Sequence, residues 1–81
     1  MAQHTSDQSV LGKIEHLVHE EQQLYGQETL SDQDQVRLET VQVELDQCWD
    51  LLRQRRARRE FGQDPDAAKV RPASVVERYK Q

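Results

Sequence analysis

The 81-residue sequence has few of the residues that build catalytic, metal-binding or disulfide-stabilised proteins, and each shortage excludes a class of protein. A single cysteine, Cys48, excludes an intramolecular disulfide and a metal site made of several cysteines from one chain. Only three glycines and two prolines are present, without a glycine-rich phosphate loop or a G-x-S-x-G nucleophile motif. The sequence therefore shows no catalytic apparatus, and we expect a non-enzymatic protein without a cofactor.

Long apolar runs and targeting signals are also missing from the sequence. No stretch approaches the roughly 20 apolar residues that a membrane span needs, so we expect no membrane contact. Residues 1–7 lack the basic and apolar regions of a secretory signal. A lone cysteine fits a reducing compartment, and the sequence favours a cytoplasmic location.

Apolar residues recur every three or four positions in two stretches, which predicts two amphipathic helices. The first helix is expected at about 9–25 and the second at about 32–61. Gly26 and Gly62 follow them, as glycines in left-handed helix caps do. The short connection requires the helices to run antiparallel. We therefore predict an all-α fold, a two-helix hairpin in which the long helix extends beyond the short one.

Two terminal segments flank the predicted hairpin, residues 9–61. Residues 1–8 are polar and lack periodicity, which predicts a disordered tail. Residues 62–81 contain a turn, and the capping-box spacing of Ser74 and Glu77 predicts a short C-terminal helix. This last segment either packs back on the second helix or becomes ordered on a partner.

The second helix carries apolar residues at alternating steps of three and four, as in coiled coils and helical bundles. Two helices do not enclose a core by themselves, so this face needs a cover. We predict that the hairpin forms a homodimer or docks on another protein, with Trp49 as the main anchor. The predicted partner interface consists of Leu38, Val41, Leu45, Trp49 and Leu52.

Charge is divided unevenly along the chain. Residues 1–50 carry eleven acids and two bases, whereas residues 51–81 carry four acids and nine bases. Five of these bases are arginines within seven positions, namely Arg53, Arg55, Arg56, Arg58 and Arg59. Either they contact phosphates of RNA or DNA, or they complement the helix dipole and pair with nearby acids. The first interpretation gives an alternative function, a nucleic-acid-associated accessory factor acting on RNA, a ribosome or a polymerase.

Two other features of the sequence are candidate sites. His16 and His19 lie one helical turn apart, but their sequence context matches neither H-E-x-x-H nor H-x-x-E-H, so we expect solvent-edge histidines and no metal. Cys48 lies on the apolar face of the second helix and lacks an obvious base. We expect it to be a small buried hydrophobic residue.

Several blocks of the sequence resemble those of a known family. The residues 44–57 read ELDQCWDLLRQRRA, and GQDPD, VRP and VERY follow in the tail. Together they resemble a family of short, uncharacterised actinobacterial proteins known as a domain of unknown function, over about residues 14–79. The resemblance implies a small helical cytoplasmic protein and supplies no activity, cofactor or catalytic residue. Because the tail blocks belong to the pattern, the resemblance also implies that residues 62–79 are not a dispensable linker.

Overall fold

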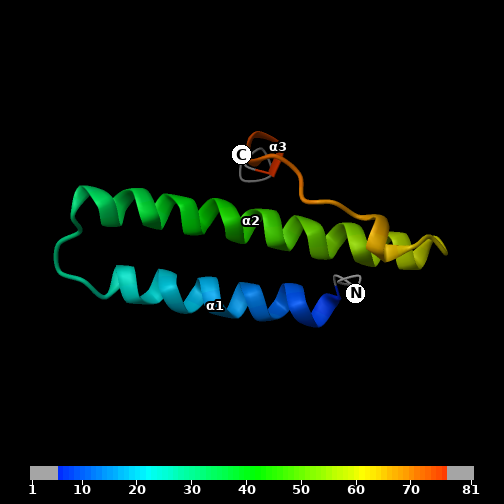
Figure 1. Ribbon diagram of the computed structural model, residues 1–81, viewed down its shortest axis with the longest axis horizontal. Coiled ribbons are helices and arrows are strands. Elements are labelled where there is room, and N and C mark those ends of the chain that lie inside the picture. The colour runs from blue at the N-terminus through cyan, green and yellow to red at the C-terminus, as the bar shows by residue number, and fades with distance from the viewer. Residues whose placement is uncertain (1–5, 77–81) are drawn as a thin grey trace, which may run out of the picture.

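The computed structural model of the protein, in which residues 6–76 are described, is a hairpin of two long antiparallel helices with a short third helix (Figure 1). The elements are α1 at Asp7–Tyr25, α2 at Asp32–Glu60, the 3-10 turn η1 at Pro65–Ala67 and α3 at Ala73–Val76. No strand occurs within the described range. The predicted all-α hairpin with a short C-terminal helix is confirmed.

The first helix begins earlier than predicted because two serines cap it. The Ser9 amide donates to Ser6 Oγ at 3.1 Å, and the Ser6 amide donates to Ser9 Oγ at 3.0 Å. This reciprocal pair satisfies amides that the first helical turn leaves without helical partners. The prediction of a disordered tail over residues 1–8 is therefore wrong for residues 6–8, and residues 1–5 lie outside the described part.

The two long helices end differently, although a glycine follows each. Gly62 has a φ of 71°, and the amide of Gln63 donates to the Arg58 carbonyl at 2.7 Å, as a left-handed Schellman cap requires. Gly26 keeps a right-handed φ of −76°. The left-handed cap expected at Gly26 is therefore not formed, and glycine's conformational freedom is used only at the end of α2.

The core lies between α1 and α2. Its buried residues are Val10, Ile14 and Leu17 from α1 and Val41, Leu45, Cys48 and Leu51 from α2. Burying each large aliphatic side chain stabilises the folded state by roughly 1.5–3 kcal/mol before entropy is counted, so this row holds the hairpin together. Near the turn, Arg37 Nη2 also donates to Glu20 Oε1 at 2.7 Å and ties the two helices at their polar edge.

The C-terminal segment packs on the side of α2 opposite α1 (Figure 1). Two glutamines of α2 hold the extended chain before α3, because Gln47 donates to the Arg71 carbonyl at 3.1 Å and Gln54 donates to the Lys69 carbonyl at 2.8 Å. Val76 is then only 2% exposed. Of the two alternatives for residues 62–81, the chain as far as residue 76 follows the first and packs back on α2.

The start of α3 differs from the predicted capping box. Ser74 lies inside α3, and the amides of Val75 and Val76 donate to the Pro72 carbonyl at 2.9 and 3.3 Å. Glu77, the other half of the predicted box, lies outside the described residues.

In the part of the chain that the structure covers, no helix is long and apolar enough to cross a membrane.

Candidate functional site

Arg55 is the one member of the arginine cluster that the fold buries, with a side chain only 6% exposed. Its Nε donates to Asp7 Oδ1 at 2.7 Å, and its Nη1 donates to Asp66 Oδ1 at 2.9 Å and to the Pro65 carbonyl at 3.2 Å. The Asp7–Arg55–Asp66 network thus ties the first turn of α1 and the η1 turn to α2. Arg55 lies inside this network rather than on a surface that a phosphate can reach.

Asp7 also binds Arg59 at the edge of the Asp7–Arg55–Asp66 network. Arg59 Nη1 donates to Asp7 Oδ1 at 3.0 Å, and Arg59 Nη2 lies 2.6 Å from Asp7 Oδ2. Hydrogen bonds from Arg59 and then Arg55 lower the pKa of Asp7 from 3.8 to about 2. The same bonds raise the pKa of both arginines. For Arg55 and Arg59, the structure therefore shows the pairing with acids that was one interpretation of the cluster.

A groove of about 220 Å³ runs between α1 and α2 beside this network. Its lining residues are Asp7 and Leu11 from α1 and Trp49, Leu52, Arg53, Arg56 and Arg59 from α2. Trp49 is 46% exposed and Leu11 is 43% exposed. The Trp49 groove therefore combines exposed apolar side chains with three arginines and one carboxylate.

The fold divides the five residues predicted as a partner interface. Val41 and Leu45 are buried in the core against α1, and Leu38 and Leu52 are half-buried. Trp49 is thus the most exposed of the five predicted interface residues, and it lies in the Trp49 groove. Leu11, an apolar residue of the first helix, also faces this groove, although it was not among the predicted interface residues.

The predicted phosphate-contact residues are divided too. Arg53, Arg56 and Arg59 line the Trp49 groove, whereas Arg55 is buried. Arg58 is half-buried, and its Nη1 lies 3.5 Å from Gln63 Oε1. The helical period explains the division, because residues three apart share a face and the arginines between them point elsewhere.

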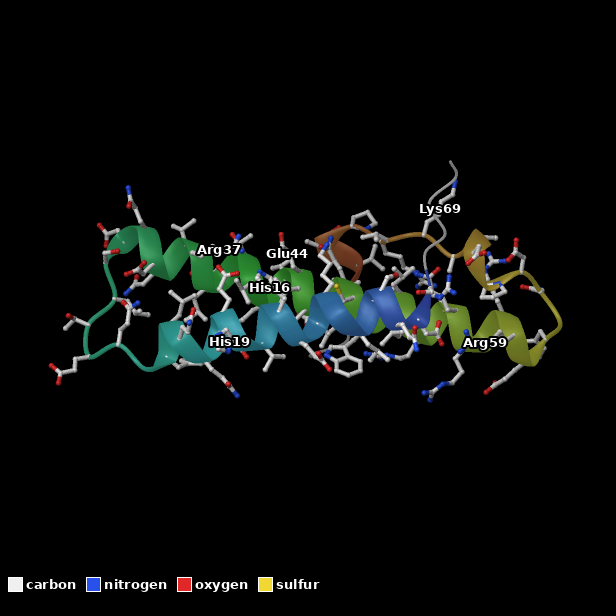
Figure 2. All side chains as sticks on the ribbon, turned by 60° about the horizontal axis from the view of Figure 1, so that its bottom comes forward. His16, His19, Arg37, Glu44, Arg59 and Lys69 are labelled. Carbon is white, nitrogen blue, oxygen red and sulfur yellow. The ribbon has the colours of Figure 1, made fainter. Side chains whose placement is uncertain are left out.

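The histidines and the cysteine lie where the sequence placed them. His16 and His19 are exposed on α1, with the Gln23 amide 3.2 Å from His19 Nε2 (Figure 2). Within residues 6–76, no three His, Cys, Asp or Glu side chains gather as metal ligands would. Cys48 is 5% exposed in the core, and this burial raises the pKa of its thiol.

The similarity to known proteins extends over nearly the whole chain. Residues 6–81 match the family described as a protein of unknown function, DUF2630. The chain belongs to the DUF2630 family. The uncharacterized proteins Rv0898c of Mycobacterium tuberculosis and Mb0922c of Mycobacterium bovis are each 47% identical over 78 residues, covering 91% of this chain and 90% of the relative. No solved structure matches the chain significantly.

The DUF2630 match confirms the resemblance to uncharacterised actinobacterial proteins and extends it at both ends. The matched region holds all three members of the Asp7–Arg55–Asp66 network and the tail that Gln47 and Gln54 bind. The DUF2630 region is thus one folded unit in which the tail, as far as residue 76, packs on the hairpin. The Trp49 groove also lies entirely within it.

Proposed function

We propose that this DUF2630 protein is a non-enzymatic interaction protein that docks a partner protein through the Trp49 groove. The observation that carries the proposal is that Trp49 stays 46% exposed although α1 and α3 both pack on α2. Partly exposed tryptophans in apolar surroundings are frequent centres of binding energy, and arginine is enriched beside them. Trp49 would insert into the partner, while Arg53 and Arg56 orient it.

The groove is well suited to binding because its walls are held in place. The core between α1 and α2 fixes Leu11 relative to Trp49, and the Asp7–Arg55–Asp66 network fixes the adjoining helix ends. A surface that is already ordered loses little conformational entropy when a partner binds. Docking then requires only that the exposed indole and its apolar neighbours lose their water.

Affinity capture with two matched variants tests this function. The tagged protein, Trp49→Ala and Phe61→Ala are used to capture partners from native cells, with and without nuclease, and partners are identified by mass spectrometry. Phe61 is the control because it is 78% exposed and lies outside the groove. We expect a protein partner that survives nuclease, persists with Phe61→Ala and disappears with Trp49→Ala. Partners that Trp49→Ala retains would contradict the proposal.

A second candidate function is the binding of a nucleic acid, which the three arginines of the groove favour. Trp49 would stack on a base while Arg53 and Arg56 contact phosphates. Asp7 in the same groove and the net charge of −4 oppose a long polyanion, so we rank this function second. It requires binding that weakens with salt and with Arg53→Gln/Arg56→Gln. Binding that changes neither with salt nor with these substitutions would exclude a nucleic-acid function.

We also propose that the protein works in the cytoplasm. Its single cysteine is a buried thiol in the core, which suits a reducing compartment. Immunodetection of the protein in cytosolic and envelope fractions tests this location, and recovery in the envelope fraction would contradict it.

A further inference from the structure

One broad face of the hairpin extends the Trp49 groove along both helices. On α1, Leu11, Val18 and Tyr25 are spaced by seven residues, and Leu11 and Tyr25 are 43% and 61% exposed. Tyr25 lies on the same side as α2's Gln42, whose amide donates to the tyrosine hydroxyl at 2.7 Å. The face thus presents three apolar side chains along α1, interspersed with the exposed Glu15 and Gln22, and Trp49 lies beside them on α2.

Charge along α2 has opposite signs on the two sides of Trp49. From Asp32 to Asp46 the helix carries five acids and one base, and from Arg53 to Glu60 it carries five bases and one acid. Six α2 residues follow one another at alternating steps of three and four and so share one stripe of the helix with Trp49, namely Glu39, Gln42, Asp46, Trp49, Arg53 and Arg56. Figure 2 shows Arg37, which lies in the acidic part of α2, and Arg59, which lies in the basic part, toward opposite ends of the molecule.

We propose, on the basis of the docking function above, that the partner on this face is a second copy of the chain in an antiparallel arrangement. A twofold axis near Trp49 would bring the two indoles together. Asp46 lies three residues before Trp49 and Arg53 lies four after it, so the axis sets Asp46 of each copy against Arg53 of the other. A surface with this symmetry is self-complementary and closes after two copies, giving a four-helix bundle.

A second copy fits the charges better than a nucleic acid does. A polyanion would meet favourable charge only near Arg53, Arg56 and Arg59, and it would meet Asp7 in the groove and the acids of the turn end. An antiparallel copy places acids against arginines at both ends of the interface. A chain of this size also gains more than a large protein from covering an exposed apolar face.

Sedimentation equilibrium of the purified full-length protein tests the dimer, with helical content checked by circular dichroism. We expect a mass twice the chain's 9.5 kDa at micromolar concentrations. Trp49→Ala should raise the dissociation constant at least about tenfold, as the loss of an interface hot spot does. Phe61→Ala should leave it unchanged. A monomeric wild type, or a dimer indifferent to Trp49→Ala, would overturn the inference.

Charge reversal tests the antiparallel register. Arg53→Glu and Asp46→Lys should each raise the dissociation constant of the homodimer at least about tenfold, because the twofold axis places the same repulsive contact at two positions in the interface. An equimolar mixture of the two variants should recover a one-to-one dimer. Lys69→Glu is the charge-matched control, since Lys69 extends from the opposite edge of the molecule to Arg59 (Figure 2). Reversal variants that dimerise as well as the wild type would overturn the antiparallel register.

The two proposals fail in different ways. A monomer that still captures another protein through Trp49 would overturn the second copy as partner and support the docking function. A dimer that survives Trp49→Ala would overturn the proposed use of this face in both.

Discussion

At the scale of single residues, Arg55 and Arg56 are neighbours in sequence with opposite environments. Arg55 is 5% exposed and binds two carboxylates, whereas Arg56 is exposed along the Trp49 groove. Replacing Arg55 by Met leaves Asp7 and Asp66 without their shared donor. Since these carboxylates are 35% and 43% exposed, water can solvate them, which moderates the cost.

We expect Arg55→Met to lower the free energy of unfolding by about 2 kcal/mol, less than for a wholly buried pair. Arg56→Met, the matched control, should change it by no more than about 0.5 kcal/mol. Urea denaturation followed by circular dichroism measures both values. Equal losses in the two variants would show that the Asp7–Arg55–Asp66 network contributes nothing specific.

The depressed pKa of Asp7 predicts a dependence of stability on pH. The folded pKa of about 2 lies below the ordinary 3.8, so folding favours the ionised carboxylate. This contribution is complete above about pH 4 and is lost as the pH falls toward 2. Because Asp7 is 35% exposed, water screens its ion pairs, and we expect a contribution of about 1 kcal/mol.

Asp7→Asn removes that charge and isolates the effect. We expect the variant to be about 1 kcal/mol less stable than the wild type at pH 7, with the difference shrinking between pH 4 and pH 2. Unfolding curves of the two proteins across this range measure the difference. A gap that stays constant with pH would mean that the ion pairs with Arg55 and Arg59 are not its cause.

At the scale of helices, two glycines predict opposite results for the same substitution. Gly62 ends α2 with a φ of 71°, a conformation that costs a residue with a Cβ about 1 kcal/mol. Gly12 lies inside α1, and nothing stands within 4 Å of an added Cβ. Gly62→Ala should therefore destabilise by about 1 kcal/mol, and Gly12→Ala should stabilise by about 0.5–1 kcal/mol. Thermal unfolding of both variants measures this, and shifts of the same sign would refute the argument.

Helix positions were the part of the fold that the sequence predicted best. Apolar residues at helical spacing located both long helices, and Ser31 capped α2 as a good N-cap residue should, accepting from the Asp34 amide at 3.1 Å. The start of α1 was missed because Ser9 supplies the capping-box partner that the usual rule assigns to Glu or Gln. Local rules thus succeeded where the capping residue was of the standard type.

At the scale of the whole molecule, contacts between distant parts of the chain were out of reach of the sequence. Asp7 and Arg55 are 48 residues apart, and periodicity alone could not identify which arginine η1 and α1 would bury. The same limit applied to the partner interface. Val41 and Leu45 are chemically suited to a partner, but α1 of the same chain covers them. Only the packing of α1 on α2 shows that Val41 and Leu45 are buried while Trp49 stays exposed.

The reactivity of Cys48 measures how often the whole hairpin opens. Its thiol is 5% exposed in the α1–α2 core, so a thiol reagent reaches it only when the helices separate. We expect labelling in native buffer to be slow relative to labelling in urea. When opening and closing are fast, the labelling rate follows the population of the open state.

The same probe decides whether the Asp7–Arg55–Asp66 network and the core unfold together. If they form one cooperative unit, a loss of about 2 kcal/mol in Arg55→Met should accelerate labelling of Cys48 roughly thirtyfold, because each 1.4 kcal/mol is a factor of ten. Arg56→Met should label at the wild-type rate. If Arg55→Met is destabilised but labels no faster, the network opens separately, and the hairpin core is stable without the ion pairs at its end.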